Sequence, residues 1–161
     1  MTTEELVSYI NSKEELNLKV EFVPNTTPGC MLVSARHLLT LMSFLHSDDK
    51  LYFDSLSAIT GIDNGPESGQ MEVIYNLYSI PNDRHLMVKV LLDREEPVTT
   101  SLCIIWKAAD WHERETYDLL GIHFEGHEDL RRILLPADWE GHPLRKDYEE
   151  QTYYRGVKVK Y

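Results

Sequence analysis

The sequence contains little of what most cofactor sites require. Cysteine occurs only at Cys30 and Cys103, which excludes CxxC metal sites and a self-contained iron–sulfur cluster, because a cluster needs about four ligands. The patterns G-x-G-x-x-G and G-x-x-x-x-G-K-[ST], which bind dinucleotides and nucleotide phosphates, are absent. The nucleophile elbow G-x-S-x-G is absent as well. We therefore expect two buried thiols and no NAD site, cluster or serine-hydrolase centre in this chain.

Positive charge and long apolar runs are also scarce. Lysine and arginine number 16 against 27 aspartate and glutamate residues, and the formal net charge is −11. Nucleic acid and anionic lipid are disfavoured as main partners, since both require a cationic footprint. No run approaches the roughly 20 apolar residues that span a bilayer, and MTTEELVSYI lacks the basic and apolar regions of a signal peptide. We expect a cytoplasmic chain that reaches a membrane only through a partner.

The hydrophobic pattern predicts an α+β core domain over residues 1–122, with helices packed on a mixed or antiparallel sheet. Thr2 and Glu5 have the spacing of a capping box before a first helix. Strict alternation over residues 71–77 and 86–92, separated by a turn, predicts a β-hairpin. Further strands are expected at 18–22, at 30–33 and within 51–62, and further helices at 34–45 and from about 101 to 120, with Gly121 as the stop.

Residues 123–161 differ in character from this core. They show neither a helical period nor sustained alternation, and several glycines and prolines interrupt them. A structureless segment of this length is unusual inside a compact domain. We therefore interpret residues 123–161 as an extended C-terminal tail that wraps along partner proteins.

Four of the seven histidines fall between residues 112 and 142, which raises the alternative of a small metal-dependent hydrolase. The segment from His112 begins like the zinc motif H-E-x-x-H, but Thr116 stands where the second histidine is required. His123 and His127 have helical spacing, yet the neighbouring glycines argue against a helix that would present both. We expect histidines that form hydrogen bonds in a polar seam, and no metal.

The last predicted helix carries two rows of side chains at i, i+4 and i+8. The row that suits an exposed face consists of Asp110, Arg114 and Asp118. The other row places Glu115 between Trp111 and Leu119, and a carboxylate on an apolar face is costly unless a cation meets it. Glu115 is therefore either partly covered and solvated, or turned inward and paired with a tail arginine. We predict the inward pair, and we therefore expect Glu115→Gln to lower the melting temperature and Glu113→Gln to do little.

Three sequence blocks occur in a fixed order near the end of the chain. They are W-H-E-R-E-T-Y-D-L-L-G-I at residues 111–122, G-H-E-D-L-R-R-I-L at 126–134 and D-W-E-G-H-P-L-R-K-D-Y at 138–148. Together they resemble the signature of the 30 kDa-type subunit of NADH-quinone oxidoreductase, the respiratory complex I. The signature or interface residues are Glu113, Arg114, Glu115, Asp118, Gly121, His127, Leu130, Arg131, Arg132, Asp138, Trp139, Gly141, His142, Pro143, Leu144, Arg145, Lys146 and Asp147.

The resemblance implies a structural subunit in the hydrophilic arm of a proton-translocating NADH:quinone oxidoreductase, at the cytoplasmic face of the bacterial inner membrane. It implies no catalytic, cofactor or metal site in this chain, because NADH, FMN, the iron–sulfur clusters and quinone belong to the rest of the complex. The implied partners are the large hydrogenase-like subunit beside the quinone site and neighbouring iron–sulfur subunits. An equivalent subunit of an energy-converting hydrogenase or formate hydrogenlyase is the nearest alternative.

Overall fold

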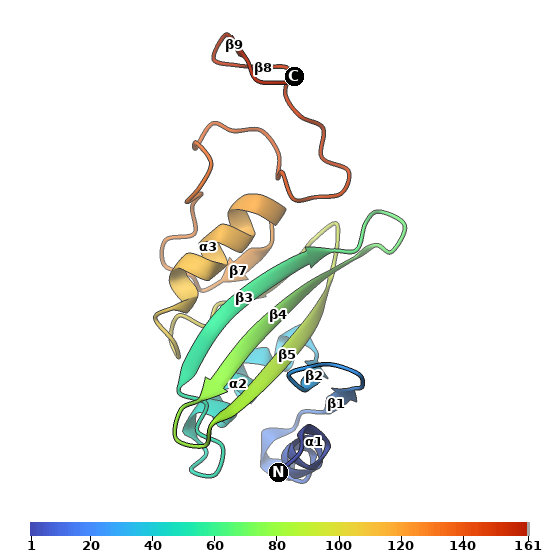
Figure 1. The fold of residues 1–161 in the computed structure, drawn as a ribbon, viewed down its shortest axis with the longest axis vertical. Helices are drawn as coiled ribbons and strands as arrows, with labels where there is room; N and C mark the ends of the chain where they lie inside the picture. Colours follow the sequence, from blue (N-terminus) through green and yellow to red (C-terminus); the bar gives the residue numbers. More distant parts are fainter. Residues whose placement is uncertain (161) are drawn as a thin grey trace.

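A five-stranded mixed sheet with the strand order β1-β2-β5-β4-β3 organises the chain (Figure 1). The computed structural model describes residues 1–160. β2 and β5 are parallel, and the other neighbouring pairs are antiparallel. The strands are β1 (Val20–Val23), β2 (Cys30–Val33), β3 (Ser55–Asp63), β4 (Gln70–Ser79) and β5 (Arg84–Asp93). The predicted α+β class with a mixed sheet is confirmed.

The hairpin predicted from alternation is formed by β4 and β5, which pair from Gln70 with Asp93 to Ser79 with Arg84. Alternate residues of β4 are buried because every second side chain faces the helices. Two helices of the N-terminal half, α1 (Thr3–Asn11) and α2 (Leu38–Ser47), supply apolar side chains to this core. The short 3₁₀ helix η1 (Glu14–Leu16) follows α1, and η2 (Ala35–His37) precedes α2. The capping box of Thr2 and Glu5 is present at the start of α1.

The third helix, α3 (Ala109–Leu120), begins later than predicted, because residues 101–108 form turns. It is preceded by β6 (Val98–Thr100) and followed by β7 (His123–Glu125), and these two strands pair in parallel. Three residues give too little alternation to be recognised as strands in the sequence. The first residues of the predicted tail therefore belong to this β–α–β unit.

The rest of the tail is irregular up to a small hairpin of β8 (Tyr153–Tyr154) and β9 (Val157–Lys158). Figure 1 shows the tail beyond α3, at the end of the molecule opposite α1. Among residues 1–160, no helix is long and apolar enough to cross a membrane.

Helix α3 packs on β3 at Gly61, where there is no room for a larger residue. A Cβ added at Gly61 would lie 2.8 Å from Cγ2 of Thr116 and would overlap Cδ1 of Leu120. We expect Gly61→Ala to lower the free energy of unfolding by about 1–3 kcal/mol, because the helix must shift to accept the methyl group. Urea denaturation measures this loss. Thr60→Val is the control, since exposed Thr60 should change stability by no more than about 0.5 kcal/mol. Equal effects of the two substitutions would contradict the close packing.

Candidate functional site

The signature block on α3 contains two buried carboxylates, and the first of them is Glu113. Its side chain is fully buried. One carboxylate oxygen accepts a hydrogen bond from the backbone N–H of Leu102 (2.7 Å), and the other accepts one from the hydroxyl of Ser101 (2.6 Å). Burial raises the pKa of Glu113, although these two donors act in the opposite direction. Glu113 therefore fixes the turn that leads into α3.

The predicted inward orientation of Glu115 is wrong. Glu115 is exposed, and Trp111 in the same row is 70% exposed. Glu113 and Asp118 are buried instead, so the expected exposed row that ended at Asp118 is also wrong at that residue. The apolar row misled the prediction because polar side chains on the buried face of α3 find hydrogen-bond donors in distant segments.

Asp118, the second buried carboxylate, holds the tail against α3. One of its oxygens accepts from the guanidinium of Arg132 at 2.8 Å. The other accepts from three consecutive backbone N–H groups, those of Ile133 (3.0 Å), Leu134 (2.8 Å) and Leu135 (2.9 Å). Burial opposes ionisation of Asp118, but the N–H of Leu135, the Arg132 guanidinium and the other two N–H groups together hold its pKa below the usual range. The carboxylate is therefore charged, and both of its oxygens accept hydrogen bonds from groups of the same chain.

Tail side chains also satisfy the carbonyl groups at the C-terminal end of α3, which have no partner within the helix. The bonds run from His142 Nδ1 to the carbonyl of Asp118 (2.9 Å) and from Arg145 Nε to the carbonyl of Leu120 (2.8 Å). The predicted stop at Gly121 is confirmed by its φ of 77°. A Cβ at this glycine would lie 2.7 Å from the His142 ring, so the close approach of the tail requires glycine here.

A second fastening of the tail lies at the end of β3. Asp63 accepts two hydrogen bonds from Arg94 (2.8 and 3.0 Å) and one from the backbone N–H of Lys146 (2.8 Å). The side chains of Asp63 and Arg94 are buried, and Arg94 also pairs with Asp147. The Arg94 guanidinium holds the pKa of Asp63 well below its usual range. Sequence reasoning missed this pair because its members are 31 residues apart in the chain.

The remaining signature residues of α3 and the tail are either half-buried or exposed. Arg131 pairs with the neighbouring Asp129, and Asp138 accepts from Tyr154 and Arg155 in the terminal hairpin. The half-buried signature residues are Arg114, Gly121, His127, Leu130, Arg132, Trp139, His142, Pro143 and Arg145, and the exposed ones are Glu115, Arg131, Asp138, Gly141, Leu144, Lys146 and Asp147.

Among residues 1–160, one group of side chains offers donor atoms for a metal. Possible ligand atoms of Cys103, Glu113 and His127 all lie within 4.8 Å of one another. However, Nδ1 of His127 accepts from the backbone N–H of Asp129 (3.0 Å), and Nε2 lies 3.2 Å from the carbonyl oxygen of Asp110, so Nε2 carries the proton. A histidine ligand needs one nitrogen free for the metal, with the other donating its N–H. Burial also raises the pKa of the Cys103 thiol to about 11. The hydrogen bonds therefore favour a structural role for this group.

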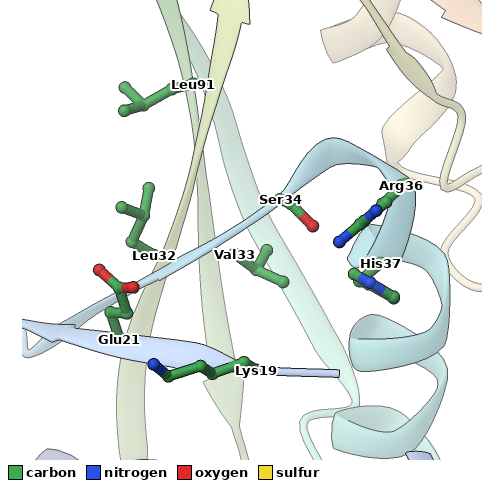
Figure 2. Close-up of a pocket in the computed structure, with 8 residues that line it drawn as sticks. All are labelled: Lys19, Glu21, Leu32, Val33, Ser34, Arg36, His37 and Leu91. Atoms are coloured by element: carbon green, nitrogen blue, oxygen red, sulfur yellow. The ribbon is translucent and has the colours of Figure 1, made fainter. Parts of the chain in front are cut away.

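A separate hollow of about 390 Å³ lies near β1, β2 and η2 (Figure 2). Lys19, Arg36 and His37 contribute basic groups, and Leu32 and Leu91 contribute apolar ones. Figure 2 shows Leu32 and Leu91 beside the strands and Arg36 and His37 at η2, so the labelled side chains do not converge on one point. The arrangement therefore lacks the convergent polar groups of a catalytic or small-molecule site.

Comparison with known proteins gives consistent matches. The sequence matches the family described as respiratory-chain NADH dehydrogenase, 30 Kd subunit, over residues 31–154. An NADH-quinone oxidoreductase subunit of Moorella thermoacetica is 41% identical over 145 residues, which are 90% of this chain and 96% of that protein. The protein of the same name from Chloroherpeton thalassium is 49% identical over 119 residues, or 73% of this chain. The match spans only about half of that longer relative, 49% of its length.

Solved structures agree with these sequence matches. A chain of the membrane-bound sulfane sulfur reductase, an archaeal respiratory membrane complex, has a TM-score of 0.74 and 26% identity, covering 91% of this chain and 85% of that chain. A trypsin-resistant fragment of Nqo5 has a TM-score of 0.63 and 26% identity, covering 81% of this chain and all of the fragment. The chain described here belongs to the family of the 30 kDa subunit of respiratory-chain NADH dehydrogenase.

Proposed function

We propose that this chain is a structural subunit of a proton-translocating NADH:quinone oxidoreductase and performs no chemistry of its own. The observation that carries the proposal is the use made of the buried signature carboxylates. The carboxylate oxygens of Glu113 and Asp118 accept hydrogen bonds from backbone N–H groups, a hydroxyl and a guanidinium of the same chain. Carboxylates bonded in this way stabilise the fold and are not available as an acid, base or nucleophile towards a substrate. NADH, FMN, the iron–sulfur clusters and quinone would be bound by other subunits.

The proposed role is to connect other subunits through the tail. The part of the tail up to Asp147 is bonded to α3, Asp63 and Arg94. The segment after Asp147 contains the hairpin of β8 and β9. Apolar side chains that stay exposed on the tail are Leu134, Leu144, Tyr153 and Val157. Their partners would be the large hydrogenase-like subunit at the quinone site and adjacent iron–sulfur subunits, at the cytoplasmic face of the bacterial inner membrane. Because the tail is already bound to α3, it loses less conformational entropy on binding a partner than a fully disordered segment would.

A second candidate is the equivalent subunit of a related membrane complex that does not use NADH. The similarity to a chain of an archaeal sulfane sulfur reductase complex supports this candidate. Purification of the tagged chain from its native membranes distinguishes the two, because the co-purified subunits either do or do not oxidise NADH. The chain purified alone is expected to show neither NADH oxidation nor the absorbance of flavin or iron–sulfur clusters.

Deletion of residues 149–161 is expected to separate folding from assembly. The hairpin in this segment contacts Asp138 and Trp139, which themselves lie in the tail. The melting transition of the isolated chain should therefore stay nearly unchanged, while recovery of the partner subunits from membranes should fall. Calorimetry of the isolated chain and quantitative pull-down of the complex measure the two effects.

Alanine substitutions in the tail provide the matched comparison. Arg132→Ala and Arg145→Ala should destabilise the isolated chain, since both guanidinium groups bind α3. Exposed Arg131→Ala should leave its folding unchanged. If the deleted chain melts normally and still recovers its partners with unchanged yield, the partner-wrapping role of the terminal segment is wrong.

A further inference from the structure

One row of side chains on α3, with apolar residues on either side of a glutamate, is left exposed by the described residues 1–160. Trp111, Glu115 and Leu119 follow one another at intervals of one helical turn. Trp111 is 70% exposed, Glu115 is exposed and Leu119 is half-buried. Tryptophan is highly buried on average in folded proteins, and it is enriched among residues that dominate binding energy at interfaces. Its exposure on a regular helix calls for an explanation outside the fold of this chain.

The fastened tail enlarges this surface. The backbone N–H of Leu144 donates to the carbonyl of Leu119 at 3.0 Å, and the Leu144 side chain is 58% exposed. Leu144, Leu119 and Glu115 line a shallow hollow of about 190 Å³ together with residues 59–61 of β3. Strand, helix and tail therefore meet at one site, whose apolar groups are held in place before any partner binds.

We propose that Trp111, Glu115, Leu119 and Leu144, here named the α3 row, dock another subunit of the same complex. The partner would present an apolar pocket for Trp111 and an arginine or lysine opposite Glu115. This inference rests on the proposed function and adds the surface and the chemistry of its partner. Figure 1 shows α3 beside β3, on the flank of the sheet.

Charge distinguishes a different subunit from other occupants. A second copy of this chain would also carry a net charge of −11, and a two-fold contact through the α3 row would bring two Glu115 side chains towards each other. An anionic membrane surface would repel both the chain and Glu115. A protein with a basic group at the centre of an apolar surface satisfies Glu115 and buries Trp111, so the row fits a heterologous protein partner.

Substitutions in the assembled complex test the α3 row. The full tagged chain carrying Trp111→Ser or Glu115→Arg is expressed in its native host, and the complex is purified from detergent-solubilised membranes. We expect at least about a tenfold loss in recovery of one partner subunit, since truncation of an interface hot spot typically has this effect or a larger one. Glu115→Gln should have a smaller effect, because it removes the attraction without adding repulsion. Ile80→Ser is the matched control, since Ile80 is 63% exposed but lies in the turn between β4 and β5.

Melting of each isolated variant and a crosslink at Trp111 complete the test. All four variants should melt like the unaltered chain, because their side chains are exposed. Benzoylphenylalanine at position 111 should crosslink to one other subunit of the complex on illumination. Two results would overturn the α3 row as the docking surface. One is a crosslink only to a second copy or to lipid, and the other is unchanged recovery of every subunit by both Trp111→Ser and Glu115→Arg. If the unaltered chain recovers no other subunit, the proposed function fails as well.

Discussion

Asp118→Asn is expected to lower the free energy of unfolding by about 3–5 kcal/mol, the usual cost of removing one member of a buried ion pair. The Asp118 side chain is fully buried and receives Arg132 together with three backbone N–H groups. An asparagine amide cannot accept all of these bonds, and its own N–H₂ group would face other donors. Urea denaturation of the isolated chain measures the loss. Limited trypsin digestion should show faster cleavage after Arg132, because the tail is no longer held.

The pH dependence of the same variant gives an independent check. The folded state lowers the pKa of Asp118, so its stabilising contribution is fully present above the ordinary aspartate pKa of about 4. That contribution is lost as the pH falls through the lower pKa of the folded chain. The difference in stability between the unaltered chain and Asp118→Asn should therefore shrink in strong acid. Exposed Glu115→Gln is the control and should differ little in stability from the unaltered chain at pH 7. Equal stabilities of the two variants at pH 7 would refute the role of Asp118.

Glu113→Leu is expected to destabilise the chain by about 1–3 kcal/mol for each buried donor that it leaves unpaired. These donors are the backbone N–H of Leu102 and the hydroxyl of Ser101. Glu113→Gln should cost less, because the amide oxygen still accepts from Leu102 and the Ser101 hydroxyl turns to accept from the amide. Circular dichroism during thermal and urea unfolding measures both changes.

The control for Glu113 is the same substitution two residues later. Glu115→Leu places leucine at an exposed position of α3 and should change stability by about 0.5 kcal/mol or less. This order of effects is the reverse of the one expected from the sequence, where Glu115 was predicted to be the buried carboxylate. If Glu115→Leu proves as damaging as Glu113→Leu, the observed orientation of α3 is contradicted.

Elements that depend on local patterns could be predicted from the sequence. The alternation in residues 71–77 and 86–92 predicted the hairpin of β4 and β5, because a strand with one buried face shows a period of two within its own residues. Thr2 with Glu5 and Gly121 marked helix ends through contacts or backbone angles within a few residues. The ordered signature blocks indicated the family, which the family match and the solved relatives confirmed.

The sequence by itself determined the strands of the five-stranded sheet, the start of α1, the end of α3 and the family of this protein, since each is encoded by neighbouring residues or by motif order. Only the tertiary structure decided which face of α3 is buried. The row with Trp111 is the more apolar one, yet Glu113 and Asp118 face inward because residues 101–102 and 132–135 bring donors to them. The spacing along the helix contains no information about donors that arrive from elsewhere in the chain, and an unpaired carboxylate would be too costly to bury without them.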